Sequence, residues 1–66
     1  MAFHDNLKRA LEVKGVSQRE LANRTGITES SISRYCSGER EPRTYTLSKI
    51  ALALHMTTDE LIGGGR

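Results

Sequence analysis

The stretch of sequence that decides the fold spans residues 17–43 and reads SQRELANRTGITESSISRYCSGEREPR. It contains two short segments with apolar residues at helical spacing, and each segment follows a hydroxyl residue and ends before a glycine, Gly26 or Gly38. A hydroxyl oxygen at the start of a helix accepts a free backbone N–H, and glycine adopts the left-handed conformation in which many helices end. The stretch therefore predicts two short helices, at 18–25 and 29–37, joined by a tight turn.

A six-residue pattern of helix starts recurs along the chain, at 16–21, 27–32 and 56–61. In each copy an apolar residue is followed by a hydroxyl residue, two further residues, a polar residue and a second apolar one. The hydroxyl can cap the first turn while the two apolar side chains pack across it. Glutamate at the fifth position of the first and third copies predicts a reciprocal capping box there, whereas Ser31 leaves the middle cap one-sided.

Helices are also predicted on both sides of this stretch. Their apolar faces are formed by Phe3, Leu7, Ala10 and Leu11 within 3–14, and by Leu47, Ile50, Ala51 and Leu54 after Pro42. The third helix start predicts a short last helix at 58–62, and no segment alternates as a strand does. The sequence therefore predicts an all-α fold of five helices that contains a helix-turn-helix, in one domain at 1–62 with a flexible glycine-rich tail at 63–66.

The size and composition of the chain limit what it can do. Its 66 residues are 36% hydrophobic, with one Phe, two Tyr and no Trp, so the core is small and cannot wall an enclosed catalytic pocket. We therefore expect no enzyme. The net charge of +2 permits an anionic partner without requiring one. No apolar run approaches the ~20 residues that cross a bilayer, and no signal peptide is recognisable, so we expect a cytoplasmic protein without a membrane partner.

The metal and thiol chemistry available to the chain is also limited. The single cysteine, Cys36, cannot form an internal disulfide, and we expect it to pack as a small buried hydrophobe rather than to act as a sensor. His4 and His55 stand near the ends of different helices, and with Cys36 they have no spacing that closes a metal site. We therefore predict no metal and no cofactor.

The helix at 29–37 has two contrasting sides on a wheel of about 100° per residue. One side carries Ile32, Tyr35 and Cys36, and the opposite side carries Ser30, Ser33, Arg34 and Ser37. Short polar side chains around one long cation allow close approach to a groove of nucleic acid, whereas a merely solvated face more often carries several Lys and Glu residues. This pattern favours DNA contact over a solvated surface.

The decisive stretch and the following LSKIALAL at 47–54 resemble the Cro/C1-type helix-turn-helix proteins, the phage-repressor-like group. The resemblance extends from Phe3 to Ile62. Its signature consists of Ser17-Gln18, Leu21-Ala22, Gly26, Ile32-Ser33, Gly38, Pro42, Leu47 and Ile50-Ala51. It implies a sequence-specific regulator of transcription, most often a repressor, that binds double-stranded DNA and places its third helix in the major groove. Such a protein is expected in the cytoplasm of a bacterial or phage-infected cell, at the nucleoid.

The resemblance also implies roles for individual residues. Base contacts are implied for Glu29, Ser30, Ser33 and Arg34, and backbone contacts for Gln18, Thr28, Ser37, Arg40 and Arg43. Arg34 can pair with guanine, and Glu29 can accept from a cytosine amino group or simply favour the helix dipole. The alternative for Arg34 is a surface ion pair with Glu29 or Glu20. Weaker phosphate candidates are Arg19, Arg24 and Lys49.

A homodimer on a palindromic operator is a further implication of the resemblance, with recognition helices about 34 Å apart along the DNA. The contact between copies is expected to involve Tyr45, Leu61 and Ile62. Many members carry a Glu at the position of Cys36, and this Glu pairs with an Arg of the first helix. This chain has Cys36 in place of the Glu and Leu11 in place of the Arg. The alternative function is a protein-interaction or antitoxin-like module with the same fold, which predicts an apolar surface outside the core and tolerance of Arg34→Ala.

Overall fold

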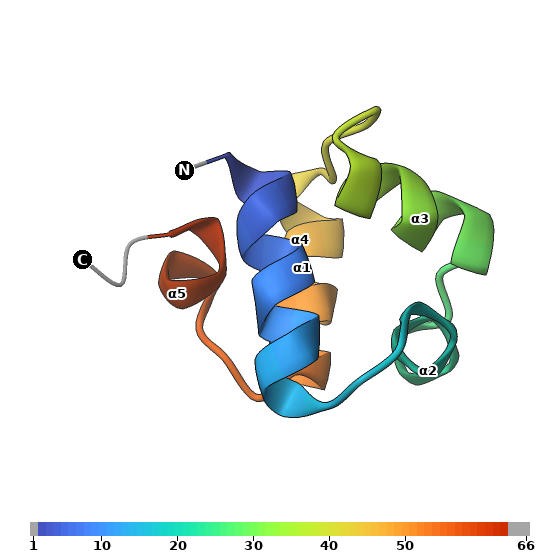
Figure 1. The fold of residues 1–66 in the computed structure, drawn as a ribbon, viewed down its shortest axis with the longest axis horizontal. Coiled ribbons are helices and arrows are strands. Elements are labelled where there is room, and N and C mark those ends of the chain that lie inside the picture. Colours follow the sequence, from blue (N-terminus) through green and yellow to red (C-terminus); the bar gives the residue numbers. More distant parts are fainter. Residues whose placement is uncertain (1, 64–66) are drawn as a thin grey trace.

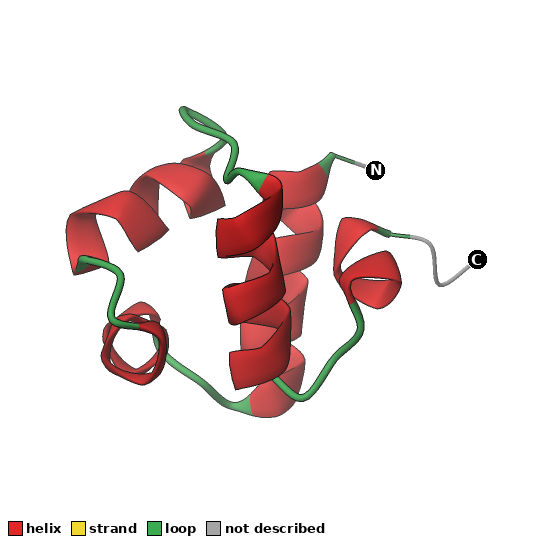
Figure 2. Cartoon of the chain, turned by 180° about the vertical axis from the view of Figure 1, so that it is seen from behind, coloured by secondary structure: helices red, strands yellow, loops and turns green. Residues whose placement is uncertain are grey.

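The computed structural model describes residues 2–63 and contains five helices within that range. They are α1 (Phe3–Lys14), α2 (Gln18–Thr25), α3 (Glu29–Ser37), α4 (Thr44–Ala53) and α5 (Thr58–Ile62) (Figure 1). Only loops and turns join them, and residues 2–63 contain no strand (Figure 2). The prediction of an all-α, five-helix fold is confirmed. The predicted tail lies outside the described residues from position 64 onwards.

The helices surround one hydrophobic core. In both views α1 and α4 occupy the middle of the molecule, with α2 and α3 to one side and α5 to the other (Figures 1 and 2). α3 packs against α1 and α2, while α5 packs against α1 and α4. The largest fully buried side chains are Leu7, Leu21, Ile32, Ile50, Leu54 and Leu61. Every helix contributes at least one of these side chains, so all five helices are needed to form the core.

Hydroxyl caps begin three of the helices as predicted. Ser17 Oγ accepts from the Glu20 N–H at 3.0 Å, and Thr28 Oγ1 accepts from the Ser31 N–H at 3.2 Å. Thr57 and Glu60 form the complete capping box expected at the start of α5. The second predicted box, at the start of α2, is wrong. The carboxylate of Glu20 accepts from Arg24 Nη2 at 2.8 Å, one helical turn further on, so only the serine half of the motif is present.

The turn between α2 and α3 is fixed by backbone geometry and by a buried threonine. Gly26 has φ +77°, a left-handed conformation that glycine adopts without steric cost. The hydroxyl of the preceding residue, Thr25, donates to the Leu21 carbonyl at 2.8 Å and accepts from the Ile27 N–H at 3.2 Å. Because Thr25 is buried, these bonds satisfy its polar atoms and hold the direction in which the chain enters α3.

Arg24 connects α2 to the end of α4. Its Nη1 donates to the carbonyl of Ala53 at 3.1 Å, while Nη2 bonds Glu20. Carbonyls in the last turn of a helix lack a partner within the helix, so this guanidinium satisfies one of them. Arg24 was a weak candidate for phosphate contact, but its bonds in the structure serve the fold. Across residues 2–63, none of the helices has the length and apolar character needed to cross a bilayer.

Candidate nucleic-acid interface

The inner and outer faces of α3 separate as the sequence predicted. Ile32, Tyr35 and Cys36 are buried, with exposed fractions of 0%, 8% and 3%. The four residues of the opposite face, Ser30, Ser33, Arg34 and Ser37, are all exposed, as is Glu29 at the start of the helix. The inner face therefore fixes the position of α3, and its outer face is available to a partner.

A hollow in the surface brings α2 and α3 residues together. Its lining consists of Gln18, Glu29, Ser30, Ser33, Arg34 and Glu39. Five of these are residues for which the sequence implied contact with DNA, and the hollow gathers all four implied base contacts. We call this surface the reading face. Gln18, the first residue of α2, belongs to it because it lines the same hollow as the α3 residues.

Glu39 is the member of the reading face that sequence analysis did not assign. It follows Gly38, the residue that ends α3. Its N–H donates to the Arg34 carbonyl at 3.1 Å, so the chain turns back towards the helix. The signal that could have found it is its position directly after the helix-ending glycine. With Glu39 included, two carboxylates share this surface with one guanidinium.

Arg34 has no ion pair within the part of the chain that the structure describes. The two acids considered as its alternative partners are engaged elsewhere. Glu20 pairs with Arg24 at 2.8 Å, and Glu29 lies 3.9 Å from Arg19. The geometry therefore gives no support to the surface ion pair as the role of Arg34, and its side chain is exposed.

The implied backbone contacts fall into two groups. Thr28 and Ser37 use their hydroxyls within the fold, because Thr28 Oγ1 also donates to Ser31 Oγ at 3.0 Å and Ser37 Oγ donates to the Arg34 carbonyl at 3.1 Å. Arg40 and Arg43 lie exposed in the loop between α3 and α4, outside the reading face. The structure therefore joins only Gln18 of this set to the base-contact residues.

The residues expected at a contact between copies do not share one environment. Tyr45 and Ile62 are 74% and 49% exposed, whereas Leu61 is fully buried. The side chain of Leu61 fills the core of the monomer, so Tyr45 and Ile62 are the exposed members of this set, and the contact between copies stays a prediction. Two further large apolar side chains are exposed, Val13 and Leu52. Among residues 2–63 these four large exposed apolar side chains lie on α1, α4 or α5, and none of them lines the reading face.

Cys36 lies in the core behind the reading face. Burial raises the pKa of its thiol from the ordinary value of 9.0, and the nearby charge of Lys8 partly offsets this rise. Leu11 is buried as well. The expectation that Cys36 is a buried free thiol is confirmed. Between residues 2 and 63, no three His, Cys, Asp or Glu side chains come together in a way that could hold a metal ion.

Fold and site together define a small helix-turn-helix protein whose third helix presents a polar face. Comparison with known proteins agrees, because the family model described as "Helix-turn-helix" matches residues 7–61. The chain belongs to this helix-turn-helix family. The Cro/C1-type resemblance seen in the sequence is thereby confirmed.

Several curated relatives are similar to nearly the whole chain. It is 43% identical over 60 residues to the HTH-type transcriptional regulator for conjugative element R391 of Providencia rettgeri, covering 91% of this chain and 27% of that protein. It is 37% identical over 62 residues to the SPbeta prophage-derived uncharacterized HTH-type transcriptional regulator YonR of Bacillus subtilis (strain 168), covering 94% and 57%. The same organism's HTH-type transcriptional regulator ImmR is 33% identical over 63 residues, covering 96% and 50%. The chain thus spans about a quarter to rather more than half of these relatives. No solved structure matches it.

Proposed function

We propose that this chain binds double-stranded DNA at a specific sequence and regulates transcription, with α3 lying in the major groove. The observation that carries this proposal is the reading face, where short polar side chains surround an Arg34 whose candidate acid partners are paired elsewhere. The relatives' names support it, since each is called a transcriptional regulator. Such a protein would act at the nucleoid, in the cytoplasm.

The chemistry of the reading face suggests how bases are recognised. Arg34 can donate two hydrogen bonds to O6 and N7 of guanine, and Glu29 can accept from the amino group of cytosine. Ser30 and Ser33 are short enough to let the helix approach while offering hydroxyls to neighbouring bases. Because these contacts of Arg34 and Glu29 both favour a G·C pair, we expect the preferred half-site to contain at least one G·C pair.

Contacts to the DNA backbone would fix the orientation of α3. Gln18 is placed for a phosphate at the edge of the groove, and Arg40 and Arg43 can reach the sugar-phosphate chain from their loop. Thr28 and Ser37 would first have to turn their hydroxyl protons away from Ser31 Oγ and the Arg34 carbonyl. We therefore expect these two residues to contribute less than Gln18 and the arginines.

A homodimer on a palindromic operator, acting as a repressor that blocks access of RNA polymerase, is the most economical form of this function. Two recognition helices must enter successive major grooves about 34 Å apart on one side of the DNA. Tyr45 and Ile62 remain the exposed candidates for the contact between copies, and they lie outside the reading face. A dimer formed through them would leave both reading faces open.

The test is selection of bound duplexes from a random pool with the purified chain. We expect a palindrome whose half-sites are one helical turn apart. If the dimer neutralises about six to eight phosphates, log affinity should fall with log salt concentration at a slope of roughly −5 to −7. Recovery of a single unrepeated half-site would contradict the proposed dimer but not sequence-specific binding. Recovery of no preferred sequence would contradict the proposed function.

The exposed apolar side chains favour one other function, that of a protein-interaction module. Val13, Tyr45, Leu52 and Ile62 give the chain apolar surface outside its core, as that alternative predicts. A module of this kind would bind DNA without sequence preference or with little dependence on salt, and it would tolerate Arg34→Ala. The selection and the salt titration therefore distinguish the two functions.

A further inference from the structure

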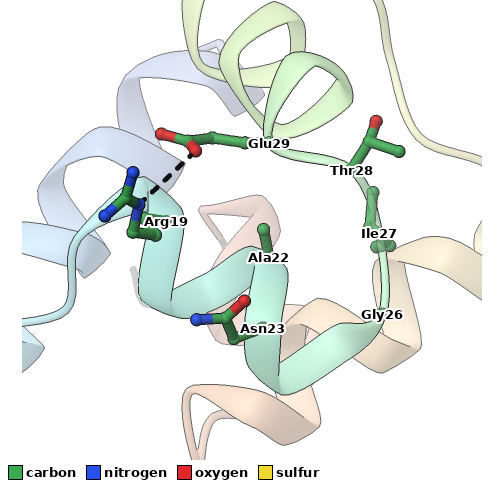
Figure 3. Close-up of a pocket in the computed structure, with 7 residues that line it drawn as sticks. All are labelled: Arg19, Ala22, Asn23, Gly26, Ile27, Thr28 and Glu29. Carbon is green, nitrogen blue, oxygen red and sulfur yellow. Dashed lines mark ion pairs between the residues drawn. The ribbon is translucent and has the colours of Figure 1, made fainter.

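An ion pair links the N-terminal ends of the two helices of the helix-turn-helix. Arg19 is the second residue of α2 and Glu29 is the first residue of α3. Their side chains point towards one another across a second hollow, and Nε of Arg19 lies 3.9 Å from Oε1 of Glu29 (Figure 3). This contact joins residues from different helices, so it depends on the way the two helices cross.

Glu29 belongs to both hollows, whereas Arg19 belongs to one. Glu29 lines the reading face together with Arg34, and it also lines the second hollow, between α2 and the start of α3. Arg19 lines only the second hollow. The guanidinium therefore approaches the carboxylate from outside the reading face. In this position Arg19 can act on bases through Glu29 rather than by direct contact.

The pair has little to do with the stability of the fold. The side chains of Arg19 and Glu29 are 81% and 56% exposed, and exposed ion pairs contribute little to folding. On DNA the situation changes, because a carboxylate brought into the groove is repelled by the phosphates. The N-terminal end of α3 and the Arg19 guanidinium both oppose that repulsion. Exclusion of water at the interface would strengthen their effect, since the local dielectric constant falls.

We propose that Arg19 is a positioning residue for base readout, holding the Glu29 carboxylate where it accepts from the exocyclic amino group of one base in the major groove. The proposal rests on the proposed function and extends it to the chemistry of one base pair. The recognised group is an amino donor, the N4 amino group of cytosine first of all, because a carboxylate can only accept.

The test measures base preference rather than affinity alone. The duplex obtained by selection is remade as a panel in which each base pair of the half-site is replaced in turn. Dissociation constants are then measured for the wild-type chain, Arg19→Ala, Glu29→Gln and the double variant. We expect Arg19→Ala to lower the preference about fivefold at one base pair, the one whose preference Glu29→Gln also changes. In the Glu29→Gln background the same arginine substitution should have no further effect.

Two further variants serve as controls. Arg19→Lys retains the positive charge and should recover part of the preference. Arg24→Ala removes an arginine of the same helix that pairs with Glu20 instead, and it should leave the preference at every base pair unchanged. Thermal unfolding of Arg19→Ala should match that of the wild type, because the side chain is largely exposed.

The contrary results are specific. Uniform weakening on every duplex, with a shallower salt dependence, would make Arg19 a phosphate contact and overturn the proposal. Equal preferences in wild type and Arg19→Ala, or an effect of Arg19→Ala that persists in the Glu29→Gln background, would overturn it as well. If the pool yields no preferred duplex, the proposed function fails and this inference fails with it. A preferred duplex without coupling between the two residues overturns the inference alone.

Discussion

The inner and outer faces of α3 differ in what constrains their side chains. On the inner face Ile32, Tyr35 and Cys36 are enclosed by neighbouring helices, so their volume and polarity are set by the core. On the outer face Ser30, Ser33 and Arg34 are exposed, and the only restriction the fold imposes is compatibility with a helix. The outer face can therefore change in sequence at little cost in stability. This separation is what allows one helix-turn-helix scaffold to present different reading faces.

The largest effect on stability is expected when a side chain of the inner face is truncated. Ile32 is fully buried, so Ile32→Ala leaves a cavity and should lower the free energy of unfolding by about 2–5 kcal/mol. In so small a domain that loss should unfold much of the population, and DNA binding should disappear with it. Urea unfolding followed by circular dichroism measures the effect. Ser33→Ala, the next residue on the outer face, is the matched control and should change stability by less than about 0.5 kcal/mol. Similar losses in both variants would contradict the contrast.

A second large effect is expected where α3 ends against α1. Gly26 and Gly38 both have positive φ, at +77° and +86°, so alanine at either should cost about 1–2 kcal/mol. A Cβ at Gly26 meets open space, whereas one at Gly38 would lie 3.0 Å from Nδ1 of His4. Gly38→Ala should therefore destabilise the chain by about 1 kcal/mol more than Gly26→Ala.

The excess at Gly38 can be assigned by a double variant. If the contact with the His4 ring causes it, Gly38→Ala measured in a His4→Ala background should cost no more than Gly26→Ala in the wild type. Thermal unfolding curves of the five chains provide the comparison. If Gly38→Ala still costs more stability than Gly26→Ala when the His4 ring is absent, the extra cost arises in the backbone. The contact between α1 and the end of α3 would then not explain it.

On the outer face the expected effect is on recognition and not on stability. Arg34→Ala should lose about 1–3 kcal/mol of discrimination at one guanine of the selected half-site. Its unfolding curve should coincide with that of the wild type, since no ion pair to Arg34 is seen in the described chain. Arg43→Ala, a backbone candidate, should instead weaken all duplexes about equally and reduce the salt slope. If Arg34→Ala weakened all duplexes equally and Arg43→Ala lost discrimination at one base pair, the reading face would have been assigned to the wrong residues.

The parts of the structure that sequence predicted are those with local signals. The bounds of four helices follow from hydroxyl caps, apolar spacing and glycines, each of which acts within a few residues of the chain. α4 was recognised by its apolar face but without bounds, because it begins after Arg43 with no side-chain cap. Its predicted face includes Leu54, which lies just beyond the last helical residue and is nevertheless buried.

The contacts that sequence did not predict join different helices or compete within one. Glu20 had two possible partners at short range, the backbone N–H of Ser17 and the guanidinium of Arg24, and spacing alone does not decide between them. The bond from Arg24 to Ala53 and the Arg19–Glu29 pair depend on crossing angles that no local pattern encodes. The structure buries Leu61, and a helix of five residues is too short for periodicity to show in advance which of its apolar residues faces inward.

The smallest expected effect concerns the inner face again, through the chemistry of Cys36. Burial raises the pKa of its thiol above 9.0, so the folded chain keeps this proton at a pH at which the unfolded chain has lost it. The stability that the neutral thiol contributes is therefore complete below pH 9.0 and declines as the pH rises from 9.0 towards the raised native pKa. Cys36→Ala has no such proton. At neutral pH it should be less stable than the wild type by about 1 kcal/mol.

The difference in unfolding free energy between the two chains should then shrink above pH 9.0. Urea titrations of both chains under reducing conditions, at steps between neutral pH and about pH 10.5, measure it. The other titratable side chains are common to the two proteins, so the difference reports the thiol together with its interaction with Lys8. A difference that stays constant would mean that the thiol titrates equally in the folded and unfolded chains. The inner face would then be open to water beside Cys36, and the contrast between the faces of α3 would not hold at that position.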